Sequence, residues 1–403
     1  MRFPNPTAAL LATAALLATA ALLATAALVA LGASPAAAKT LYVSAKGIDA
    51  PGCTKAMPCQ TIGFGVAQAA SGDTVSVAPG AYRESVTVAK DVTVIGVGDP
   101  VLDAGGHTNG ILITGPGAGG ATVRGFIVEH AVQEGILALR TSRVTIAGNQ
   151  VLSNDRGSFA ADPTGACVGS GNVPGDCGEG IHLESVNHAT VSGNRVEHDT
   201  GGILLSDEVG PTDANLVSHN TVIDNPWACG ITLVGHSANA YTAAGPTPST
   251  GGVYGNRVID NTVNGNGTKS LGGGILLASG VPGAGVYSNL IEGNVANDNG
   301  LGGLTIHAHV AGQDFNGNRI IANTFSHDGL HGYPNGAPGD SDVAVHHTVG
   351  ILIYSLATRL AGTVVRGNHL SDEFYGIWTD NAPAIKKPAN IFAKGVRVAL
   401  SQR

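Results

Sequence analysis

A short motif, in which glycine is followed by alternating apolar residues, returns along most of the chain. The motif begins at Gly110, Gly135, Gly180, Gly202, Gly230, Gly274, Gly303, Gly350 and Gly376. The shortest intervals are roughly 22 to 29 residues, which is typical of a solenoid. One repeat of this size cannot bury its own apolar side, so it must stack on its neighbours. The pattern therefore predicts a stack of coils.

The alternation inside each motif has a period of two residues, which is typical of a β-strand with one buried face. In the motif at Gly180, Ile181 and Leu183 are expected to point inward and His182 and Glu184 outward. Stacked coils then form parallel strands about 4.8 Å apart. We expect an all-β solenoid with one internal isoleucine stack, made by Ile181, Ile203, Ile231 and Ile275.

A second motif, asparagine-x-apolar, recurs in phase with the first. It begins at Asn149, Asn194, Asn220, Asn256, Asn289, Asn318 and Asn368. Asparagine tolerates the left-handed backbone of a sharp corner, and its amide can bond to the equivalent amide in the next coil. We interpret these residues as corner ladders, because a ligand site would not need the same residue in every coil. Arg195, Arg257 and Arg319 each follow such an asparagine and are expected to form a surface column.

Three segments of the first part of the chain carry a family resemblance. Residues 40–44, 58–62 and 72–82, followed by the repeats, resemble the opening of the pectate-lyase-like right-handed parallel β-helix superfamily. The resemblance extends over nearly the whole chain after residue 38 and implies a single-stranded right-handed parallel β-helix. That superfamily includes pectate and alginate lyases, polygalacturonases, epimerases, tail-spike modules and a factor serving the copper site of nitrous oxide reductase.

The catalytic signatures of these enzymes are incomplete in this sequence. It contains neither the paired aspartates and Gly-His-Gly of polygalacturonases nor the Asp-Pro-His of alginate epimerases. The resemblance therefore implies the fold and a carbohydrate-active protein, without selecting one reaction.

The first 38 residues have the composition of an export signal. Arg2 precedes an Ala/Leu-rich run over residues 8–31, and small residues end at Ala38. We predict a signal peptide over residues 1–38, a β-helix domain over residues 39–403, and a secreted, extracellular protein. An uncleaved membrane anchor is the alternative, because the apolar run is long for a signal peptide. After cleavage we expect no membrane span.

The charge of the chain limits its partners. The formal net charge is -8 and charged residues are 12% of the sequence. Mild acidity argues against capture of nucleic acid by bulk charge. We expect a polysaccharide substrate or ligand, no nucleic-acid partner, and a monomer or a homotrimer.

The five cysteines fit an exported protein. Cys53 and Cys59 are predicted to form a disulfide. Cys167 and Cys177 lie in one insertion and are candidates for a second bond, which leaves Cys229; a Cys177–Cys229 bond is the competing pairing. The absence of a Cys-x-x-Cys motif argues against a cysteine-based metal site.

The regular repeat is framed by a helix and interrupted by insertions. Residues 61–70 are predicted to form an amphipathic helix that caps the open N-terminal end, and strands over residues 74–77 and 92–95 begin the coils. The basic segment after Asp380 is expected to close the other end. Insertions fall at residues 155–176, 235–251 and 326–348. Insertions in a solenoid leave as loops, often around its binding face. We expect residues 326–348 to be exposed and to shield one side of the site.

The outward positions predict two columns of side chains. The first column is His182, Leu204, Thr232, Leu276, Thr305, Leu352 and Trp378. The second is Glu184, Ser206, Val234, Ala278, His307, Tyr354 and Asp380. They produce two polar clusters, one with Glu184, Asp207, Glu208 and His236, the other with His307, His309, Tyr354, Trp378 and Asp380. Val234, Leu276 and Ala278 form an apolar floor between them, suited to a sugar chain, with Trp378 and His182 among the contacts.

The second cluster favours β-elimination from a uronic acid. This reaction needs a base, an acid and a cation beside the sugar carboxylate. His307 and Tyr354 occupy one column in adjacent coils and are the candidate base and acid. The cation would come from Arg359, Arg366 or a bound calcium ion; beyond that calcium, no cofactor is predicted. The first cluster instead indicates glycoside hydrolysis, with Glu184 as acid and Asp207 or Glu208 as its partner. We rank the lyase slightly ahead.

Two further interpretations involve no such chemistry. The first is a copper or zinc site in which His327, His331, His346 and His347 join His307 and His309. The second is a cell-surface binding or scaffolding β-helix whose outward Asp, Glu and His residues are solvated surface.

Overall fold

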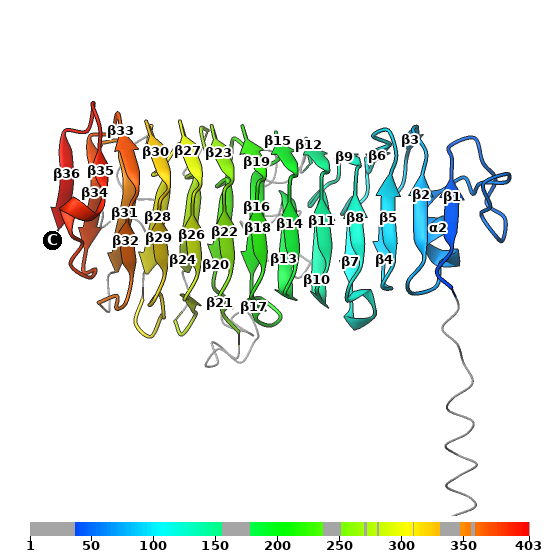
Figure 1. Ribbon diagram of the computed structural model, residues 1–403, viewed down its shortest axis with the longest axis horizontal. Helices are drawn as coiled ribbons and strands as arrows, with labels where there is room; N and C mark the ends of the chain where they lie inside the picture. Colours follow the sequence, from blue (N-terminus) through cyan, green and yellow to red (C-terminus); the bar gives the residue numbers. More distant parts are fainter. Residues whose placement is uncertain are drawn as a thin grey trace, which may run out of the picture. The chain divides into compact units, whose positions relative to one another are not determined.

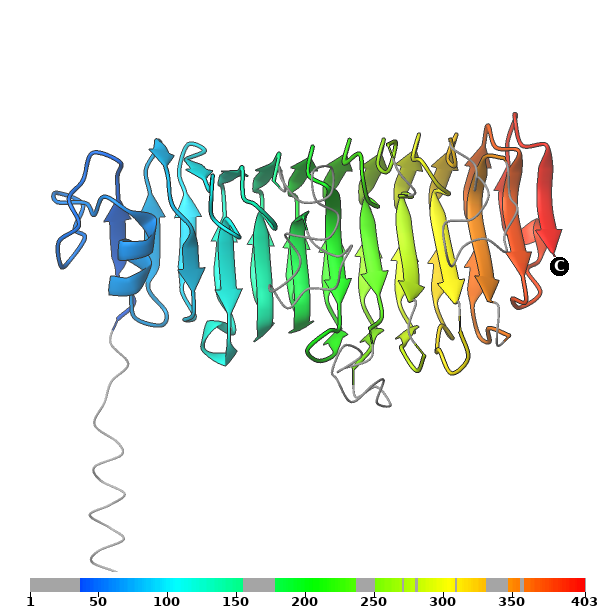
Figure 2. The same ribbon diagram turned by 180° about the vertical axis from the view of Figure 1, so that it is seen from behind.

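The computed structural model describes residues 37–154, 178–236, 251–269, 272–279, 282–308, 310–330, 347–355 and 359–402. The chain divides into two units, Met1–Lys39 and Thr40–Arg403, and all elements below belong to the second. That unit is an elongated stack of coils from β1 to β36 (Figures 1 and 2). Within the described residues no helix combines the length and apolar character needed to cross a bilayer.

The described strands form three sheets in which neighbours run parallel, and each regular coil passes through sheets C, A and B in turn. Sheet A contains β1 (Thr40–Val43), β2 (Thr74–Val77), β5 (Thr93–Gly96), β8 (Thr122–Arg124), β11 (Thr145–Ala147), β14 (Thr190–Ser192), β18 (Leu216–Ser218), β22 (Arg257–Ile259), β26 (Leu290–Glu292), β29 (Arg319–Ile321) and β32 (Val364–Arg366). Sheet B contains β3 (Ala81–Tyr82), β6 (Val101–Asp103), β9 (Ile127–Glu129), β12 (Gln150–Leu152), β15 (Arg195–Glu197), β19 (Thr221–Ile223), β23 (Thr262–Asn264), β27 (Val295–Asn297), β30 (Thr324–Ser326), β33 (His369–Ser371) and β35 (Ile391–Phe392).

Sheet C carries the glycine motifs. It contains β4 (Val86–Val88), β7 (Ile111–Thr114), β10 (Ile136–Ser142), β13 (Glu179–Asn187), β16 (Gly201–Ser206), β20 (Ile231–Val234), β24 (Ile275–Ser279), β28 (Leu304–Ala308), β31 (Val349–Ser355), β34 (Tyr375–Asp380) and β36 (Val398–Gln402), with the side branch β17 (Thr212–Asp213), β21 (Val253–Tyr254) and β25 (Val286–Tyr287). Short 3-10 helices occupy Pro116–Ala118 and Lys387–Ala389. The parallel β-helix predicted from the repeats is confirmed.

The internal isoleucine stack is confirmed by the register of sheet C. Ile181 pairs with Ile203, Ile203 with Ile231, and Ile231 with Ile275, and all four side chains are buried. Because these side chains point into the coil, the intervening residues of the same strands must leave from its outer face.

The glycine of each motif is required by close packing at the corner before sheet C. A Cβ on Gly180 would collide with Val196 Cγ1 and come within 2.5 Å of Asp199 Oδ2. On Gly303 it would meet Phe325 Cδ1 at 2.5 Å and collide with Asp328 Oδ2. The motif therefore marks the positions where the coil turns against a buried side chain of sheet B.

The predicted asparagine ladders exist, but the motif occupies two corners rather than one. The AB ladder, between sheets A and B, is Asn149, Asn194, Asn220, Asn261, Asn294, Asn323, Asn368 and Asn390. The CA ladder is Asn215, Asn256, Asn289 and Asn318. A third, the BC ladder, was not predicted and contains Asn154, Asp199, Asn225, Asn266, Asn299, Asp328 and Glu373.

Two details of the prediction are wrong. Except at Asn390, the left-handed residue is the one before the ladder asparagine: Gly193 has a φ of 63° and His219 a φ of 56°. The ladder asparagines keep ordinary backbone and use the side chain to bond along the stack. Arg195 lies in sheet B, whereas Arg257 and Arg319 lie in sheet A, so these exposed arginines do not form one column.

The predicted capping helix is α2 (Ile62–Gln68), which lies beside β1 and β2 (Figure 1). Thr61 is its N-cap, and its Oγ1 accepts from Phe64 N at 3.3 Å. Glu84 accepts from the Ile62 and Gly63 amides at 2.7 and 2.8 Å. These contacts satisfy the first amide groups of the helix and hold it on the end of the coil.

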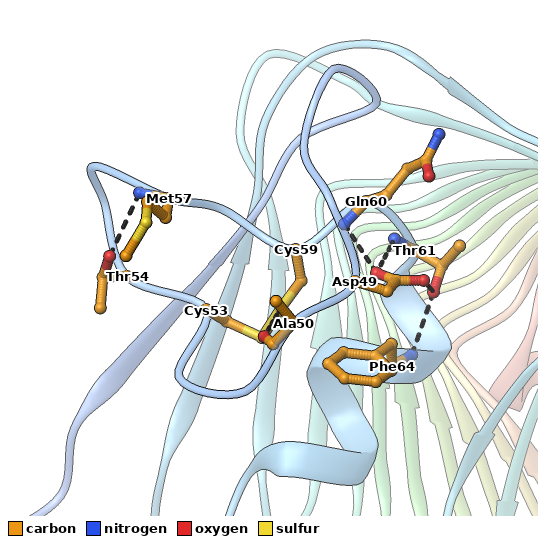
Figure 3. The surroundings of a disulfide bond; sticks show 9 residues. All are labelled: Asp49, Ala50, Cys53, Thr54, Met57, Cys59, Gln60, Thr61 and Phe64. Carbon is orange, nitrogen blue, oxygen red and sulfur yellow. Dashed lines mark hydrogen bonds between the residues drawn. A yellow bond between two sulfur atoms is a disulfide. The ribbon is translucent and has the colours of Figure 1, made fainter.

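The loop before this helix is closed by the predicted Cys53–Cys59 disulfide (Figure 3). Asp49 accepts from Gln60 N and from the Thr61 hydroxyl at 2.7 and 2.8 Å, which ties the loop to the helix N-cap. Cys229 is buried, and its sulfur accepts from Gly273 N at 3.2 Å. Cys167 and Cys177 lie outside the described residues, as do residues 155–177, 237–250 and 331–346 within the three predicted insertions.

Candidate functional site

The register of sheet C confirms both predicted outward columns. Strand pairing aligns the first column in the order His182, Leu204, Thr232, Leu276, Thr305, Leu352, Trp378. It aligns the second in the order Glu184, Ser206, Val234, Ala278, His307, Tyr354, Asp380. The two clusters predicted from the sequence therefore belong to one continuous face.

The exposure of this face differs from the expectation of an open, solvated surface. Its two ends are buried: Ser206 is 0% exposed and Tyr354 is 1% exposed. The middle is half-exposed, at Thr232, Leu276 and Ala278, beside Val234 at 9%, and so is Asp380, the last member of the second column. We call Thr232, Val234, Leu276 and Ala278 the central strip. It is the predicted apolar floor, flanked by Ser206 on one side and His307 on the other.

A buried hydrogen-bonded chain occupies the N-terminal end of the face. His182 Nε2 lies 2.7 Å from Ser206 Oγ, and the Ser206 hydroxyl donates to Glu208. On the other side of the ring, His182 Nδ1 lies 3.5 Å from Glu134 Oε1. His236 Nδ1 is 3.5 Å from Glu208 Oε1. The structure thus joins His182 and Glu208 through Ser206, brings His236 beside Glu208, and adds Glu134, which was missed.

Burial and neighbouring charges shift the pKa values in this cluster. Burial alone lowers the pKa of His182, but the bond to Glu134 and the charge of Glu208 outweigh it and raise that pKa to about 10. Burial raises the pKa of Glu184 to about 7, against the opposing charge of His182. Burial also raises the pKa of Asp207 to about 7. Glu184 and Asp207 therefore change protonation near neutral pH, well above the usual range of a carboxyl group.

Asp207 has a positioning role in this arrangement. Its two carboxylate oxygens accept from the backbone amides of His236 and Gly252. These amides flank the segment 237–250, so Asp207 ties both ends of that insertion to the turn after β16. Of the two predicted carboxylate partners of Glu184, Glu208 is therefore the better placed for chemistry.

The other end of the face contains the predicted His307–Tyr354 pair. The ring centroids are 4.5 Å apart with the planes tilted by 48°. Tyr354 and Trp378 pack with Leu301, Val349 and Leu352 in a second apolar cluster outside the coil. Trp378 is 3% exposed, so it offers no open face on which a sugar could stack. Asp380 is half-exposed next to Tyr354, and His309 lies outside the described residues.

The two arginines predicted as cations for a lyase reaction, Arg359 and Arg366, lie in different parts of the coil. Arg366 belongs to β32 of sheet A, so it is not on the face that carries His307. Arg359 is exposed and follows residues 356–358, which are outside the described part of the chain.

The histidines of the predicted copper or zinc site do not gather within the described residues. His327 Nδ1 lies 2.7 Å from Asp298 Oδ1, and His347 stacks on Phe374 at 3.9 Å. His331 and His346 lie outside the described residues. His327 and His347 line a cavity of about 550 Å³ at the corner before sheet C, with Glu373, Phe374 and Arg397.

Within the described residues two groups of side chains have a spacing that suits a metal ion. One is Glu134, Glu179 and His182, all buried; the other is Glu197, His198 and Asp224, at the surface. Glu134 and Glu179 each stand directly before a motif glycine in successive coils. An acid in the same repeat position of two neighbouring coils is the signal that could have identified them from the sequence.

Comparison with known proteins agrees with this fold. The family model described as right handed beta helix region matches residues 81–244. Pectate lyase Pel9A shares a TM-score of 0.52 at 15% identity, over 84% of this chain and 80% of the other. Dettilon tailspike protein (gp208) gives 0.51 at 15% identity, over 90% and 68%. XylC in complex with xylose gives 0.50 at 12% identity, over 90% and 70%.

No curated protein matches the sequence. Identities this low show a shared fold and leave the reaction open. The family match over residues 81–244, the three parallel sheets and the likeness to a pectate lyase all agree with the resemblance seen in the sequence. The chain has the fold of a right-handed parallel β-helix protein, and its residues 81–244 match the right handed beta helix region family.

Proposed function

We propose that this is an exported carbohydrate-active protein that binds a polysaccharide across the central strip of sheet C. The strip is the half-exposed middle of a face that has a buried polar cluster at Ser206 on one side and the buried His307 with the apolar cluster of Tyr354 and Trp378 on the other. Ser206 and His307 stand on its two sides in one column, separated by Val234 and Ala278, which corresponds to about 14 Å of coil stacking. The Cys53–Cys59 disulfide supports export to an oxidising compartment.

The reaction that the geometry supports best is β-elimination from a uronic acid, with His307 as base. The observation that carries this proposal is the position of His307, which pairs with Ala278 at the edge of the strip and has the Tyr354 ring 4.5 Å away on its other side. In this proposal His307 takes the proton beside the sugar carboxylate and Tyr354 gives a proton to the leaving oxygen. His307 is 3% exposed and Tyr354 1% exposed, so the proposal requires that a sugar gains access to both side chains on binding. Arg359 is the proposed partner of the sugar carboxylate.

The described residues at this end of the face offer few ligands for a calcium ion. In the second column from Val234 to Asp380, the carboxylate among the described residues is that of Asp380 alone. Calcium takes about six to eight oxygen ligands. We therefore assign no step of the reaction to it.

The test is a panel of uronic-acid polysaccharides assayed at the ultraviolet band of unsaturated products, with reducing ends measured in parallel. Tyr354→Phe keeps the packing of the buried ring and removes the acid, so turnover should fall by about 100-fold or more. Tyr287→Phe is the matched control, because the Tyr287 ring stacks on that of Tyr254 with centroids 4.9 Å apart and belongs to neither outward column. Equal activity of both variants would refute the assignment of Tyr354.

Glycoside hydrolysis is the second candidate, because the structure brings Glu184, Glu208 and His182 together at the opposite side of the strip. The same assay separates the two reactions. Hydrolysis would appear as reducing ends without ultraviolet absorption, lost in Glu184→Gln and kept in Tyr354→Phe. Binding of a polysaccharide with neither product would identify a non-catalytic binding protein.

A further inference from the structure

The buried group Glu134, Glu179 and His182 lies at the edge of the face that carries the proposed reaction. Glu134 precedes β10, and Glu179 and His182 belong to β13, the next strand of sheet C. Their ligand atoms all lie within 4.8 Å of one another. Glu134 and His182 are 0% exposed, whereas Glu179 is 5% exposed and forms the edge nearest to solvent.

The direction of the hydrogen bonds fixes one nitrogen of His182. Ser206 has one hydroxyl proton, which it donates to Glu208. The 2.7 Å bond between Ser206 Oγ and His182 Nε2 must then be donated by the imidazole. Nε2 therefore carries a proton, and Nδ1 faces the carboxylate of Glu134. A lone pair on Nδ1 and a carboxylate oxygen repel each other, so the space between them must hold positive charge, either a proton or a cation.

The distance between these two atoms distinguishes the two cases. His182 Nδ1 and Glu134 Oε1 are 3.5 Å apart. A charge-assisted hydrogen bond between such groups is shorter, about 2.7 to 2.9 Å. Two ligands at about 2.1 Å from a tetrahedral metal ion are about 3.4 Å apart. The observed distance is longer than the first and close to the second, so a metal ion could replace the proton on Nδ1 with little movement of either ligand.

The surrounding groups hold both ligands in orientations that suit a metal ion. His182 donates its other ring N–H to Ser206, which fixes the tautomer that leaves Nδ1 for the metal. The Asn109 amide, with its nitrogen facing Glu134, donates to Glu134 Oε2 at 2.5 Å and leaves Oε1 toward His182. Such outer contacts orient metal ligands and are part of a metal site.

We propose that Glu134, Glu179 and His182 bind a divalent transition-metal ion of the zinc type. Two carboxylates and an imidazole are a ligand set that suits zinc, whereas calcium and magnesium take oxygen ligands. Three protein ligands leave one tetrahedral position for water. The site is independent of the His307–Tyr354 pair, so the metal can bind whether or not the protein is a lyase.

The test uses the purified mature protein after treatment with a chelator and dialysis. Titration with zinc chloride followed by calorimetry, with metal content measured by mass spectrometry, should give one zinc per chain, and zinc should raise the melting temperature. Glu179→Gln lies at the edge of the site and should fold; its zinc affinity should fall by about 100-fold. Calcium chloride should not compete.

Glu197→Gln is the matched control, because Glu197 belongs to the surface group with His198 and Asp224. It should keep wild-type zinc affinity. Absence of stoichiometric zinc binding would overturn the proposal, and so would binding that Glu197→Gln weakens and Glu179→Gln leaves unchanged. Because both measurements concern the metal alone, they stand apart from any result of the polysaccharide assay.

Discussion

The AB and BC ladders occupy two corners of the same coils, but only one of them is built from a single residue type. Every member of the AB ladder is asparagine, from Asn149 to Asn390. The BC ladder has acids at Asp199, Asp328 and Glu373. An amide both donates and accepts, so it can continue a ladder through any number of coils. An ionised carboxylate only accepts and therefore interrupts the donor sequence.

The acids of the BC ladder lie beside the proposed metal site and beside the corner cavity. Asp199 packs against Gly180, one residue from Glu179 of the proposed metal site. Glu373 lines the corner cavity, and its Oε1 accepts from Asp328 N at 2.8 Å. We infer that uniform stacking stabilises the coil, whereas departures from it mark where a buried carboxyl group was accepted for another purpose.

The largest effect is expected from breaking the uniform ladder at Asn220. Its Oδ1 accepts from Asn194 N and Nδ2, both at 3.0 Å, and its Nδ2 donates to Asn261 at 3.0 Å. Asn220→Ala leaves several buried groups without partners, so the free energy of unfolding should fall by about 4 kcal/mol. Denaturant titration measures this.

The control for that measurement is Asn187→Ala. Asn187 is half-exposed and its side chain contacts His188 at 3.3 Å, so the loss should be below about 0.5 kcal/mol. Equal losses in the two variants would show that the ladder contributes no more than an ordinary surface amide.

Much of the fold could be predicted because each coil repeats the same local pattern. The glycine motif fixed the strands of sheet C, and its two-residue period fixed which side chains leave the coil. The assignment of asparagines to corners failed because Asn220 and Asn256 begin the same tripeptide pattern at different corners. The signal for all three ladders is a spacing of five residues, as in Asn215, Asn220 and Asn225.

The sequence predicted which side chains of the candidate site align in neighbouring strands, but not how deeply they are buried. Period-two alternation places His182 and Tyr354 outside the coil, but it contains no information on what packs against the outer face. For this reason we predicted that Trp378 would contact a sugar, whereas its side chain is buried in the structure. Glu134 was missed because it precedes its strand, outside the columns that alternation defines.

A smaller effect is expected on the pH dependence of the free energy of unfolding. It should distinguish the acidic end of the BC ladder from the uniform AB ladder. Burial raises the pKa of Glu373 from 4.5 to about 8 and raises that of Asp328 well above its usual value. A carboxyl group whose folded pKa is raised stabilises the protein below the unfolded pKa and loses that contribution as pH rises through the folded pKa. The free energy of unfolding should therefore fall between about pH 4.5 and pH 8.

Glu373→Gln keeps an acceptor for Asp328 N and removes this titration. The fall with rising pH should shrink by on the order of 2 kcal/mol relative to the wild type. Glu292→Gln, a half-exposed residue of sheet A, is the control and should leave the pH profile unchanged. A Glu373→Gln profile parallel to that of the wild type would contradict the role of burial at this position.

The smallest effect is expected when Asp328 is replaced by asparagine, the residue at most other positions of the BC ladder. Asp328 Oδ1 accepts from Asn299 N and Nδ2 at 3.0 and 2.8 Å, and an asparagine can accept both bonds. Its added Nδ2 could donate along the stack as Asn299 Nδ2 does to Val263 O at 2.9 Å. Asp328→Asn should therefore raise the free energy of unfolding by about 1 kcal/mol at neutral pH. Asn299→Asp, the reverse change one coil earlier, should lower it by a similar or larger amount. If Asp328→Asn instead destabilises the protein, the carboxyl group of Asp328 stabilises the corner beside the cavity. The two ladders would then differ by local packing rather than by the missing amide donor.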